Sequence, residues 1–562
     1  MRSLLRYLLW FPFSRKSPRS VGCSNEDKAS ISSTSVLEGV LAKGTAFTIA
    51  GDHLNALRQF EQAIEINPSS SIAYCHAGIA AFEIGILDTA QDYFVLALHY
   101  DSRNEDATLG LARVLRVAGQ IDRAIALLHG VTATSPERGD ASYELACCQH
   151  ACADFEGAIE SLQQDLKFRP TAASSLNLLG LILAREFGQL KKGEEFVRRA
   201  LQVSPGFAAA LSNLGWILAE QGRLGEALNC FDQVLDSLPG DEETRLMRAY
   251  AQLKHGNFDA GWQDFSARHA SPLAVSTRFM LPELPLLTGL AGKRVLIYAE
   301  QGLGDQIMFA SCIPDFLEHG GYCALECDGS LVALFQRSFP ECLVFARKSE
   351  GFPAQLPIQL GDFDGQLAIG SLPAIFRRRS QDFSSHKGYL RPDPKKVSLW
   401  RKKLADMGGG PYIGISWRGG THSTRRQLRS IPLSQWKPIL THPGKFISLQ
   451  YGECKEDLAQ AEEAGFRIQN WPEAIENYDE TAALVAALDL VISVCTAVVH
   501  LGGALGRPVW VLTPAVAEWR YLSQGERLPW YPSVRLFRQR LDTDWSEVIA
   551  SVAQSLKNAS LD

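Results

Sequence analysis

Apolar residues return along the first half of the chain with a period that fits pairs of short helices. In each unit a small residue occupies the eighth position, and in most units an alanine occupies the twentieth and a large apolar residue the twenty-fourth. Small residues let two helix backbones approach, a large residue fills the space between them, and a proline such as Pro68 or Pro136 ends the second helix. The pattern predicts antiparallel helix pairs over residues 37–270. The units begin, at intervals of 34 or 35 residues, at Leu37, Ser71, Glu105, Gly139, Ala173, Ala208 and Glu242.

This pattern resembles a tetratricopeptide repeat array of about six units and a partial seventh. The resemblance implies an α-solenoid whose concave face binds a protein or a peptide and which has no catalytic chemistry of its own. The fifth unit carries one extra residue around 186–188 and Gly193 at the position that is alanine in most other units. We therefore expect a local distortion between the two helices of that unit.

From residue 290 the pattern changes to short β-rich runs separated by helix-like segments such as 307–319 and 330–339. The alternation predicts parallel sheets in two α/β units, 290–380 and 401–562, with linkers at 271–289 and 381–400. Ligands of such sheets bind beyond the carboxyl ends of the strands, so motifs at those ends can converge on one cleft. The expected strands lie within 294–300, 323–329, 364–370, 412–420, 445–452, 466–472, 489–496 and 508–514.

The first 36 residues form a basic and apolar tail whose longest apolar stretch is much too short to span a membrane. Two interpretations stay open: a disordered tail, or a weak anchor at the membrane surface. The net charge of −6 gives no reason to expect nucleic acid as a partner. The cysteines are scattered without paired CxxC spacing, so we expect no zinc site, and reduced thiols in a cytoplasmic protein.

The segment DLVISVCTAVVHLGGALGRPVWVLTP, residues 489–514, carries the clearest candidate site. A strand runs to Ser493, a turn holds Cys495 and Thr496, and a helix begins at Ala497, whose amide groups would face a phosphate. Thr496 can cap that helix and also reach a phosphate oxygen. His500, one turn into the helix, is either a satisfied core histidine or a contact to the sugar or the phosphate.

The same segment resembles the signature of bacterial heptosyltransferase-like glycosyltransferases. GLGDQIMFASCIP at 302–314 is similar to their first loop, and YIGISWRGG with RSIPLSQW is similar to the start of their second domain. With the repeats and the ending PWYPSVRLFRQ, the chain resembles repeat-fused glycosyltransferases, a set that includes flagellin glycosyltransferases. The resemblance implies a GT-B fold of two Rossmann-like domains and inverting transfer from a nucleotide sugar, with no cofactor and no required metal.

The resemblance also suggests residue roles. It makes Asp305, presented by a turn in which Gly304 lets the backbone approach the sugar, the proposed catalytic base; the alternative is that Asp305 caps a helix starting at Gln306. Arg418 and Arg429 would meet the charge of the leaving phosphate. Gln450 is a candidate for the base or ribose pocket. Thr481, with Glu480, is either a helix cap or a donor contact.

One position departs from the family pattern: heptosyltransferases have aspartate where Cys495 stands, which argues for a changed donor rather than an inactive enzyme. Near the end of the chain, Trp519 and Trp530 lie with Arg520 and other basic residues. Such a group can stack a ring and hold an acid group, or it can serve as ordinary aromatic packing.

The leading hypothesis is an enzyme that glycosylates a protein hydroxyl, with the repeats recruiting the acceptor. By resemblance, flagellin is the favoured acceptor and a CMP-activated nonulosonic acid a plausible donor. A heptosyltransferase-like enzyme of the cell envelope and a non-catalytic repeat scaffold are the alternatives.

Overall fold

The computed structural model describes residues 28–269, 279, 281–284, 292–347, 362–383, 386–420, 426–541 and 543–559, without the side chains of 28–34. Most of the predicted N-terminal tail, and with it the anchor hypothesis, lies outside these residues. Helix α1 (Lys28–Ile49) begins inside the segment predicted as tail. None of the described helices is both long and apolar enough to cross a membrane.

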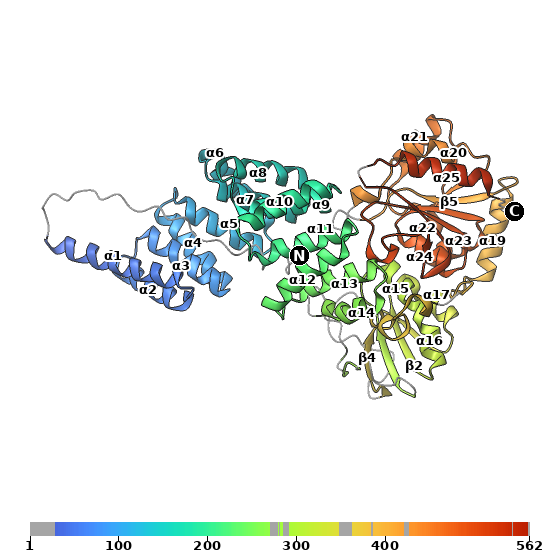
Figure 1. Ribbon diagram of the computed structural model, residues 1–562, viewed down its shortest axis with the longest axis horizontal. Helices are drawn as coiled ribbons and strands as arrows, with labels where there is room; N and C mark the ends of the chain where they lie inside the picture. Colours follow the sequence, from blue (N-terminus) through green and yellow to red (C-terminus); the bar gives the residue numbers. More distant parts are fainter. Residues whose placement is uncertain are drawn as a thin grey trace. The chain divides into compact units, whose positions relative to one another are not determined.

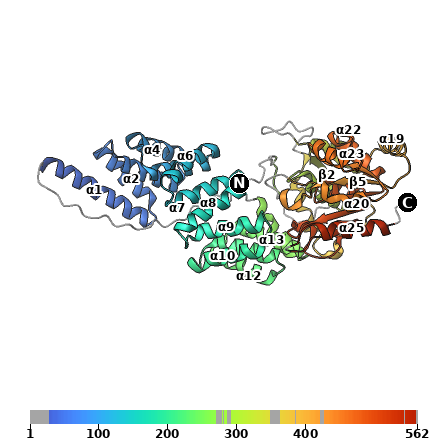
Figure 2. The same ribbon diagram turned by 90° about the horizontal axis from the view of Figure 1, so that it is seen from above.

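Contacts divide the described chain into two compact units, and the division falls within the predicted repeat array. The first holds α1–α8, most of α9 and α10, and the start of α11; the second holds residues 183–194 and everything from Leu211 onward. In the first unit successive helices pack side by side as antiparallel pairs (Figures 1 and 2). After α1 they are α2 (His53–Ile66), α3 (Ser71–Ile84), α4 (Leu87–Tyr100), α5 (Glu105–Val117), α6 (Ile121–Thr134), α7 (Gly139–Ala151) and α8 (Phe155–Phe168).

The residues expected to bring the helices together do so. A Cβ atom added at Gly78 would lie 2.8 Å from the ring of Phe94, so Gly78 lets α3 approach α4 closely. Polar residues begin several helices by accepting a backbone N–H: Ser70 accepts from Ala73, and Asn104 accepts from Ala107. The helical repeat array is therefore confirmed.

The later repeat helices are α9 (Ala173–Arg185), α10 (Leu190–Val203), α11 (Ala208–Glu220), α12 (Leu224–Ser237), α13 (Glu242–Lys254) and α14 (Phe258–Phe265). Four residues separate α9 from α10, whereas three separate α11 from α12. The extra residue of the fifth unit thus enlarges the turn, where Gly188 takes a positive φ of 68°.

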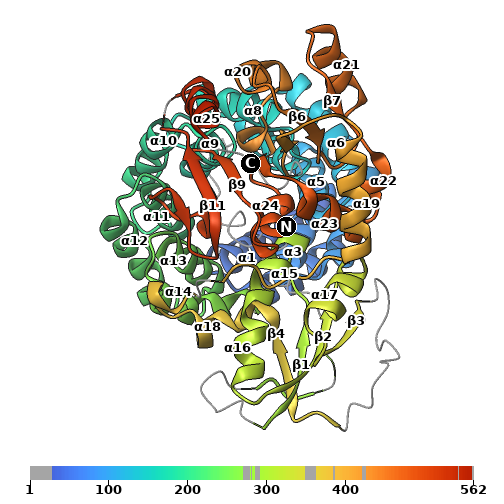
Figure 3. The same cartoon turned by 90° about the vertical axis from the view of Figure 1, so that its right-hand side faces the viewer.

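Parallel sheets follow the repeats, as the alternating pattern predicts. The first α/β lobe has four parallel strands in the order β3-β2-β1-β4, drawn in yellow-green to ochre in Figure 3. Strand β3 was not expected from the sequence. The elements of this lobe are β1 (Arg294–Tyr298), α15 (Leu303–Phe309), α16 (Ile313–Glu318), β2 (Tyr322–Cys327), α17 (Val332–Ser338), β3 (Leu343–Ala346), β4 (Gly365–Ala368) and α18 (Pro373–Phe376).

The second α/β lobe has seven strands in the order β10-β11-β9-β8-β5-β6-β7, all parallel except the β10–β11 pair. The antiparallel edge and strand β11 were not expected. The elements are α19 (Pro394–Ala405), β5 (Tyr412–Ser416), α20 (Lys437–Leu440), β6 (Lys445–Ser448), α21 (Lys455–Glu463), β7 (Ile468–Gln469), α22 (Pro472–Glu476), α23 (Tyr478–Ala487), β8 (Leu490–Val494), α24 (Ala497–Ala504), β9 (Val509–Thr513), β10 (Arg527–Leu528), β11 (Tyr531–Arg538) and α25 (Ser546–Asn558).

The linker prediction for 381–400 needs a correction, because α19 begins inside it. Asp393 caps this helix by accepting the backbone N–H groups of Lys395 and Lys396, and Pro394 occupies the first helical position. Both are standard signals of a helix start. The basic composition of the segment concealed them.

Candidate functional site

The turn that carries Asp305 lies where the two lobes meet. It follows β1 and opens α15, and α15 packs against α24 of the second lobe. A Cβ atom at Gly304 would lie 2.9 Å from Cδ2 of His500 and 3.4 Å from the Cα atom of Ala497. Gly304 therefore allows the close approach of the two helices, which is the backbone contact the structure shows for this residue.

Asp305 takes part in the start of the helix, although not in the way expected. Helix α15 begins at Leu303 rather than Gln306, and Gly302 is its first flanking residue. The Asp305 carboxylate accepts the backbone N–H of Gly302 through Oδ2 at 3.3 Å. Its other oxygen, Oδ1, accepts from Nη2 of Arg520 at 2.5 Å. The carboxylate thus combines a local capping contact with an ion pair that crosses between the lobes.

Four charged residues form what we term the interlobe charge cluster: Asp305, Arg429, Glu518 and Arg520. Arg520 also pairs through Nη1 with Oε2 of Glu518, and Nη1 of Arg429 lies 2.8 Å from Oε1 of Glu518. The four side chains are 12–23% exposed. Within the described part of the chain, the buried Nε atoms of Arg429 and Arg520 have no hydrogen-bond partner. The cluster is neutral in sum and retains unused donors.

The segment that carries Glu518 and Arg520 follows β9 and is held by the last repeat. Nζ of Lys254, at the end of α13, donates to the backbone carbonyl of Ala517 at 2.9 Å, and the backbone N–H of Ser523 donates to the carbonyl of Lys254 at 2.8 Å. Trp519 packs on Trp262 and on neighbouring aromatic rings. Aromatic packing is therefore the role the structure shows for Trp519, while the flanking residues Glu518 and Arg520 belong to the interlobe charge cluster.

Cys495 lies beneath the cluster as a buried, neutral thiol. Burial raises its pKa to about 11, although the nearby charge of Arg429 and a hydrogen bond with Tyr521 act in the opposite direction. Burial also lowers the pKa of Arg429 itself. A neutral thiol cannot repel an anion, as the aspartate of the heptosyltransferase pattern would at this position.

His500 resembles a satisfied core histidine more than an exposed ligand contact. Its side chain is buried, and Nδ1 lies 3.1 Å from the hydroxyl of Tyr531. Burial, aided by the charge of Arg520, lowers the pKa of His500 to about 3, so the ring is neutral at physiological pH. It packs at the junction of α15 and α24.

Thr496 occupies the position before α24 but does not cap the helix through its side chain. Its hydroxyl lies 3.0 Å from that of Ser493, which corrects the capping prediction: a neighbouring hydroxyl engages the oxygen instead. A Cβ atom at Gly419 would lie 2.8 Å from the carbonyl oxygen of Cys495. The end of β5 therefore runs close beside this turn.

Two residues predicted to contact the nucleotide-sugar donor, Gln450 and Arg418, lie at the ends of β6 and β5 instead of in the cluster. Oε1 of Gln450 accepts the backbone N–H groups of Trp417 at 3.0 Å and Arg418 at 2.9 Å, and its amide nitrogen donates to two carbonyls. Gln450 thus holds the two strand ends together. Nη2 of Arg418 lies 3.0 Å from Oδ2 of Asp457, while its buried Nε has no partner among the described residues. The basic loop between Arg418 and Arg429 lies partly outside those residues.

Thr481 is also engaged internally. Its hydroxyl donates to the carbonyls of Ala474 at 2.5 Å and Asn477 at 3.2 Å. The cap of α23 is Asn477, which accepts from the backbone of Asp479 and Glu480. Of the two roles considered for Glu480 and Thr481, helix cap or contact to the sugar donor, the helix cap is therefore wrong, because Asn477 caps α23.

Glu518 is the functional candidate that the sequence pattern missed. It stands two residues before Arg520 in PAVAEWRYL, at the N-cap of a short 3-10 helix over Trp519–Tyr521, and no local pattern marks it as a partner of Arg429. The tryptophan between them favoured the prediction of a ring-stacking site and left Glu518 without a predicted role.

Among the described residues, no group of three or more histidine, cysteine or acidic side chains has the arrangement of a metal site.

These features define the class: a tetratricopeptide repeat protein in which the repeats are followed by two α/β lobes, one with a parallel sheet and one with a sheet that is parallel except at its β10–β11 edge. The family model for the tetratricopeptide repeat matches residues 117–182 and 184–249. The chain is 32% identical to Protein FlbA of Caulobacter vibrioides over 527 residues, which cover 90% of this chain and 82% of that protein. The chain belongs to the family of Protein FlbA.

Two further similarities are to tetratricopeptide repeat proteins. A TPR repeat-containing protein of Pseudomonas aeruginosa is 30% identical over 94 residues, 16% of each chain. The crystal structure of a thermophilic TPR protein from Thermus thermophilus is 23% identical, with a TM-score of 0.30, over 33% of this chain and all of that one.

Proposed function

We propose that the chain is an inverting glycosyltransferase that moves a sugar from a nucleotide-activated donor to a hydroxyl group of a protein. The observation that carries the proposal is the interlobe charge cluster, in which the carboxylate of Asp305, in the first turn of α15, pairs with Arg520 of the second lobe, and Arg520 shares Glu518 with Arg429. The segments before Asp305 and Glu518 follow the carboxyl ends of β1 and β9, where open parallel sheets bind ligands. Similarity of the loop and helix motifs to heptosyltransferase-like enzymes supplies the reaction class.

The proposed chemistry assigns one task to each charge. Asp305 takes the proton of the acceptor hydroxyl as that oxygen bonds to the anomeric carbon, on the face opposite the leaving group. The bond between this carbon and the phosphate oxygen breaks, and its electron pair leaves with the phosphate. Arg429 and Arg520 stabilise the charge that develops there. This reaction uses no cofactor; the nucleotide sugar is a substrate.

Substitution of Asp305 tests this mechanism. In the full chain, supplied with donor and protein acceptor, Asp305→Asn should lower the rate of transfer about 10²- to 10⁴-fold, the usual contribution of a general base. Donor binding should remain within a few fold. Asp328→Asn is the matched control, because Asp328 follows β2 and, among the described residues, its carboxylate accepts hydrogen bonds from Ser330 alone. Equal transfer by wild type and Asp305→Asn would remove Asp305 from the mechanism.

The donor can be identified without knowing the acceptor. Thermal shifts with CMP-, UDP-, GDP- and ADP-sugars should reveal one nucleotide class that stabilises the protein. By resemblance we propose a CMP-activated nonulosonic acid. A shift with ADP-heptose alone would favour the heptosyltransferase-like alternative, and no shift with any nucleotide sugar would favour the scaffold.

We further propose that the repeats recruit the acceptor, with flagellin favoured by the same resemblance. A chain starting at Ser204 would lack most of the first unit but keep α11–α14, and with them the contacts of Lys254 and Trp262. It should bind donor normally and lose modification of the protein acceptor. A chain starting at Gly292 should lose donor binding as well. Normal modification by the first truncation would contradict recruitment by the repeats.

A further inference from the structure

The Glu518 carboxylate fills the space between two guanidinium groups. Its Oε1 atom lies 2.8 Å from Nη1 of Arg429, and its Oε2 atom pairs with Nη1 of Arg520. Two arginines converging on two oxygens is the geometry by which proteins hold phosphate or carboxylate ligands. Here a side chain of the protein occupies that position.

The charges of the cluster make Glu518 and a bound anion mutually exclusive. With Glu518 in place, two arginines balance two carboxylates. An anion that entered without displacing Glu518 would leave an excess of negative charge among side chains that are only 12–23% exposed. Partial burial makes such an excess costly. Replacement of one carboxylate by another oxyanion keeps the balance.

Glu518 can leave by rotation of its side chain while its backbone stays fixed. The segment is held on one side by Lys254, which binds the carbonyl of Ala517 and the N–H of Ser523. On the other side Arg538 donates to the carbonyls of Tyr521, Leu522, Gln524 and Gly525. Arg520, anchored in the same segment, stays in place to receive the incoming anion.

We propose that Glu518 is an internal substitute for an oxyanion of the ligand: it holds Arg429 and Arg520 in position while the site is empty, and an entering phosphate or carboxylate displaces it. Glu518 is thus a positioning residue that competes with the ligand. The assignment of this oxyanion to the nucleotide-sugar donor rests on the proposed function, whereas the displacement itself does not.

Binding of two simple anions to the full chain tests the displacement. Isothermal titration with inorganic pyrophosphate and with free N-acetylneuraminate, both in EDTA, separates a phosphate from a sugar carboxylate as the source of the oxyanion. Glu518→Gln keeps the size of the side chain and removes its charge, so at least one anion should bind about 10-fold tighter than to wild type, a typical coupling between competing ligands. Glu526→Gln, which removes an exposed carboxylate paired with Arg535, should change neither affinity.

The double variant Glu518→Gln/Arg429→Gln should lose the gain, because the arginine that receives the anion is gone. Unchanged or weaker binding of both anions to a folded Glu518→Gln protein, with circular dichroism equal to wild type, would overturn the inference. Tighter binding of an anion together with normal transfer by Asp305→Asn would keep the displacement and refute the proposed mechanism. The two proposals therefore fail separately.

Discussion

Two clusters in this chain place a glutamate carboxylate between two arginines, and they differ in access to solvent. In the repeats, Glu144 of α7 accepts from Arg113 at 2.7 Å and from Arg116 at 3.2 Å. The Glu144 side chain is 3% exposed, against 23% for Glu518, so the two carboxylates differ in burial even though Arg113 is itself 23% exposed. Both clusters combine a carboxylate with two guanidinium groups. Burial of the carboxylate therefore distinguishes a structural ion pair from a site that an anion can reach.

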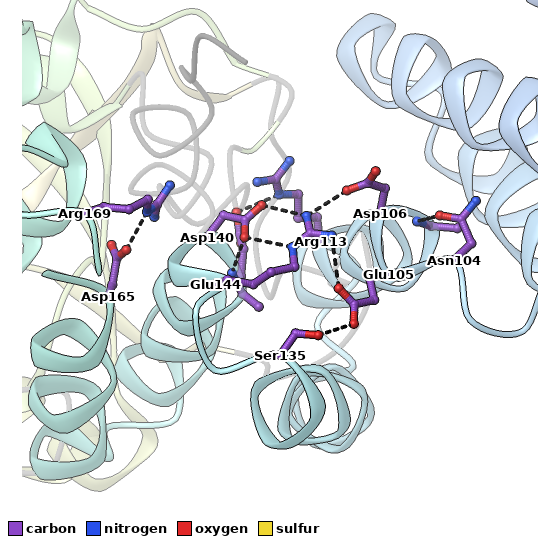
Figure 4. A network of polar contacts seen from close by, with 12 residues as sticks. Asn104, Glu105, Asp106, Arg113, Ser135, Asp140, Glu144, Asp165 and Arg169 are labelled. Atoms are coloured by element: carbon purple, nitrogen blue, oxygen red, sulfur yellow. Dashed lines mark hydrogen bonds and ion pairs between the residues drawn. The ribbon is translucent and has the colours of Figure 1, made fainter. Parts of the chain in front are cut away.

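The repeat network extends this pair across neighbouring helices (Figure 4). Arg138 lies 2.7 Å from Asp106 and 2.8 Å from Asp140, which ties the turn before α7 to the start of α5. Burial opposes the ionisation of Glu144, but the charges of Arg113 and Arg116 outweigh it and lower the pKa of the carboxyl. The network therefore keeps Glu144 ionised inside the helix stack.

The comparison predicts that the largest loss of stability follows removal of the buried carboxylate of Glu144. Glu144→Ala leaves two arginines without their partner and should lower the free energy of unfolding of the repeats by about 3–5 kcal/mol. Urea unfolding followed by far-ultraviolet circular dichroism measures the loss. Asp106→Ala, at the exposed end of the same network, is the control and should cost no more than about 1 kcal/mol. Equal losses would show that burial does not separate these ion pairs.

A second prediction concerns the geometry of the interlobe charge cluster. Arg520 uses Nη2 for Asp305 and Nη1 for Glu518, and the single ammonium of a lysine cannot reproduce this fork. Arg520→Lys should therefore lower kcat/KM for transfer by the value of one charge-assisted hydrogen bond, about 1.5–3 kcal/mol or roughly 10- to 150-fold. The melting temperature should stay close to that of wild type.

Arg535→Lys is the control for that experiment, because Arg535 pairs with the exposed Glu526 in the same lobe. A large fall in melting temperature for Arg520→Lys, with normal transfer by the protein that remains folded, would assign Arg520 to stability. The cluster would then resemble the repeat network in role as well as in chemistry.

The sequence predicts the parts of this comparison that depend on local pattern. The repeat period, most strands and the turn of Asp305 follow from residues near one another in the chain. The interlobe charge cluster joins segments around 305, 429 and 520, and their meeting depends on how the two lobes pack. No local pattern carries that information, which is why Glu518 was missed.

Local signals were also misjudged where two roles compete for one side chain. Thr496 looks like a helix cap, yet its hydroxyl meets Ser493. Gln450 stands at a strand end, yet its amide is used by the backbone beside it. In both cases the sequence predicts the position of the residue at the end of a strand or the start of a helix. The neighbouring polar groups determine which hydrogen bonds its side chain forms.

The smallest predicted effect concerns the neutral ring of His500. Its pKa is lowered to about 3 by burial, against a reference value of 6.5, so between these values the unfolded chain takes up a proton that the folded protein excludes. The stability associated with His500 is complete above pH 6.5 and falls as the pH decreases. At pH 5.5 the loss amounts to about 1.4 kcal/mol.

Melting temperatures of wild type and His500→Asn between pH 7.5 and 5.5 measure this pH-dependent contribution of His500 to stability. The variant should be less stable at pH 7.5, because it loses packing against Gly304 and the contact with Tyr531, and the difference should narrow as the pH falls. If the melting temperatures of the two proteins fall in parallel as the pH decreases, His500 takes up a proton in the folded state as readily as in the unfolded chain. In that case the junction of α15 and α24 would admit water and charge, and burial would no longer distinguish His500 from the cluster beside it.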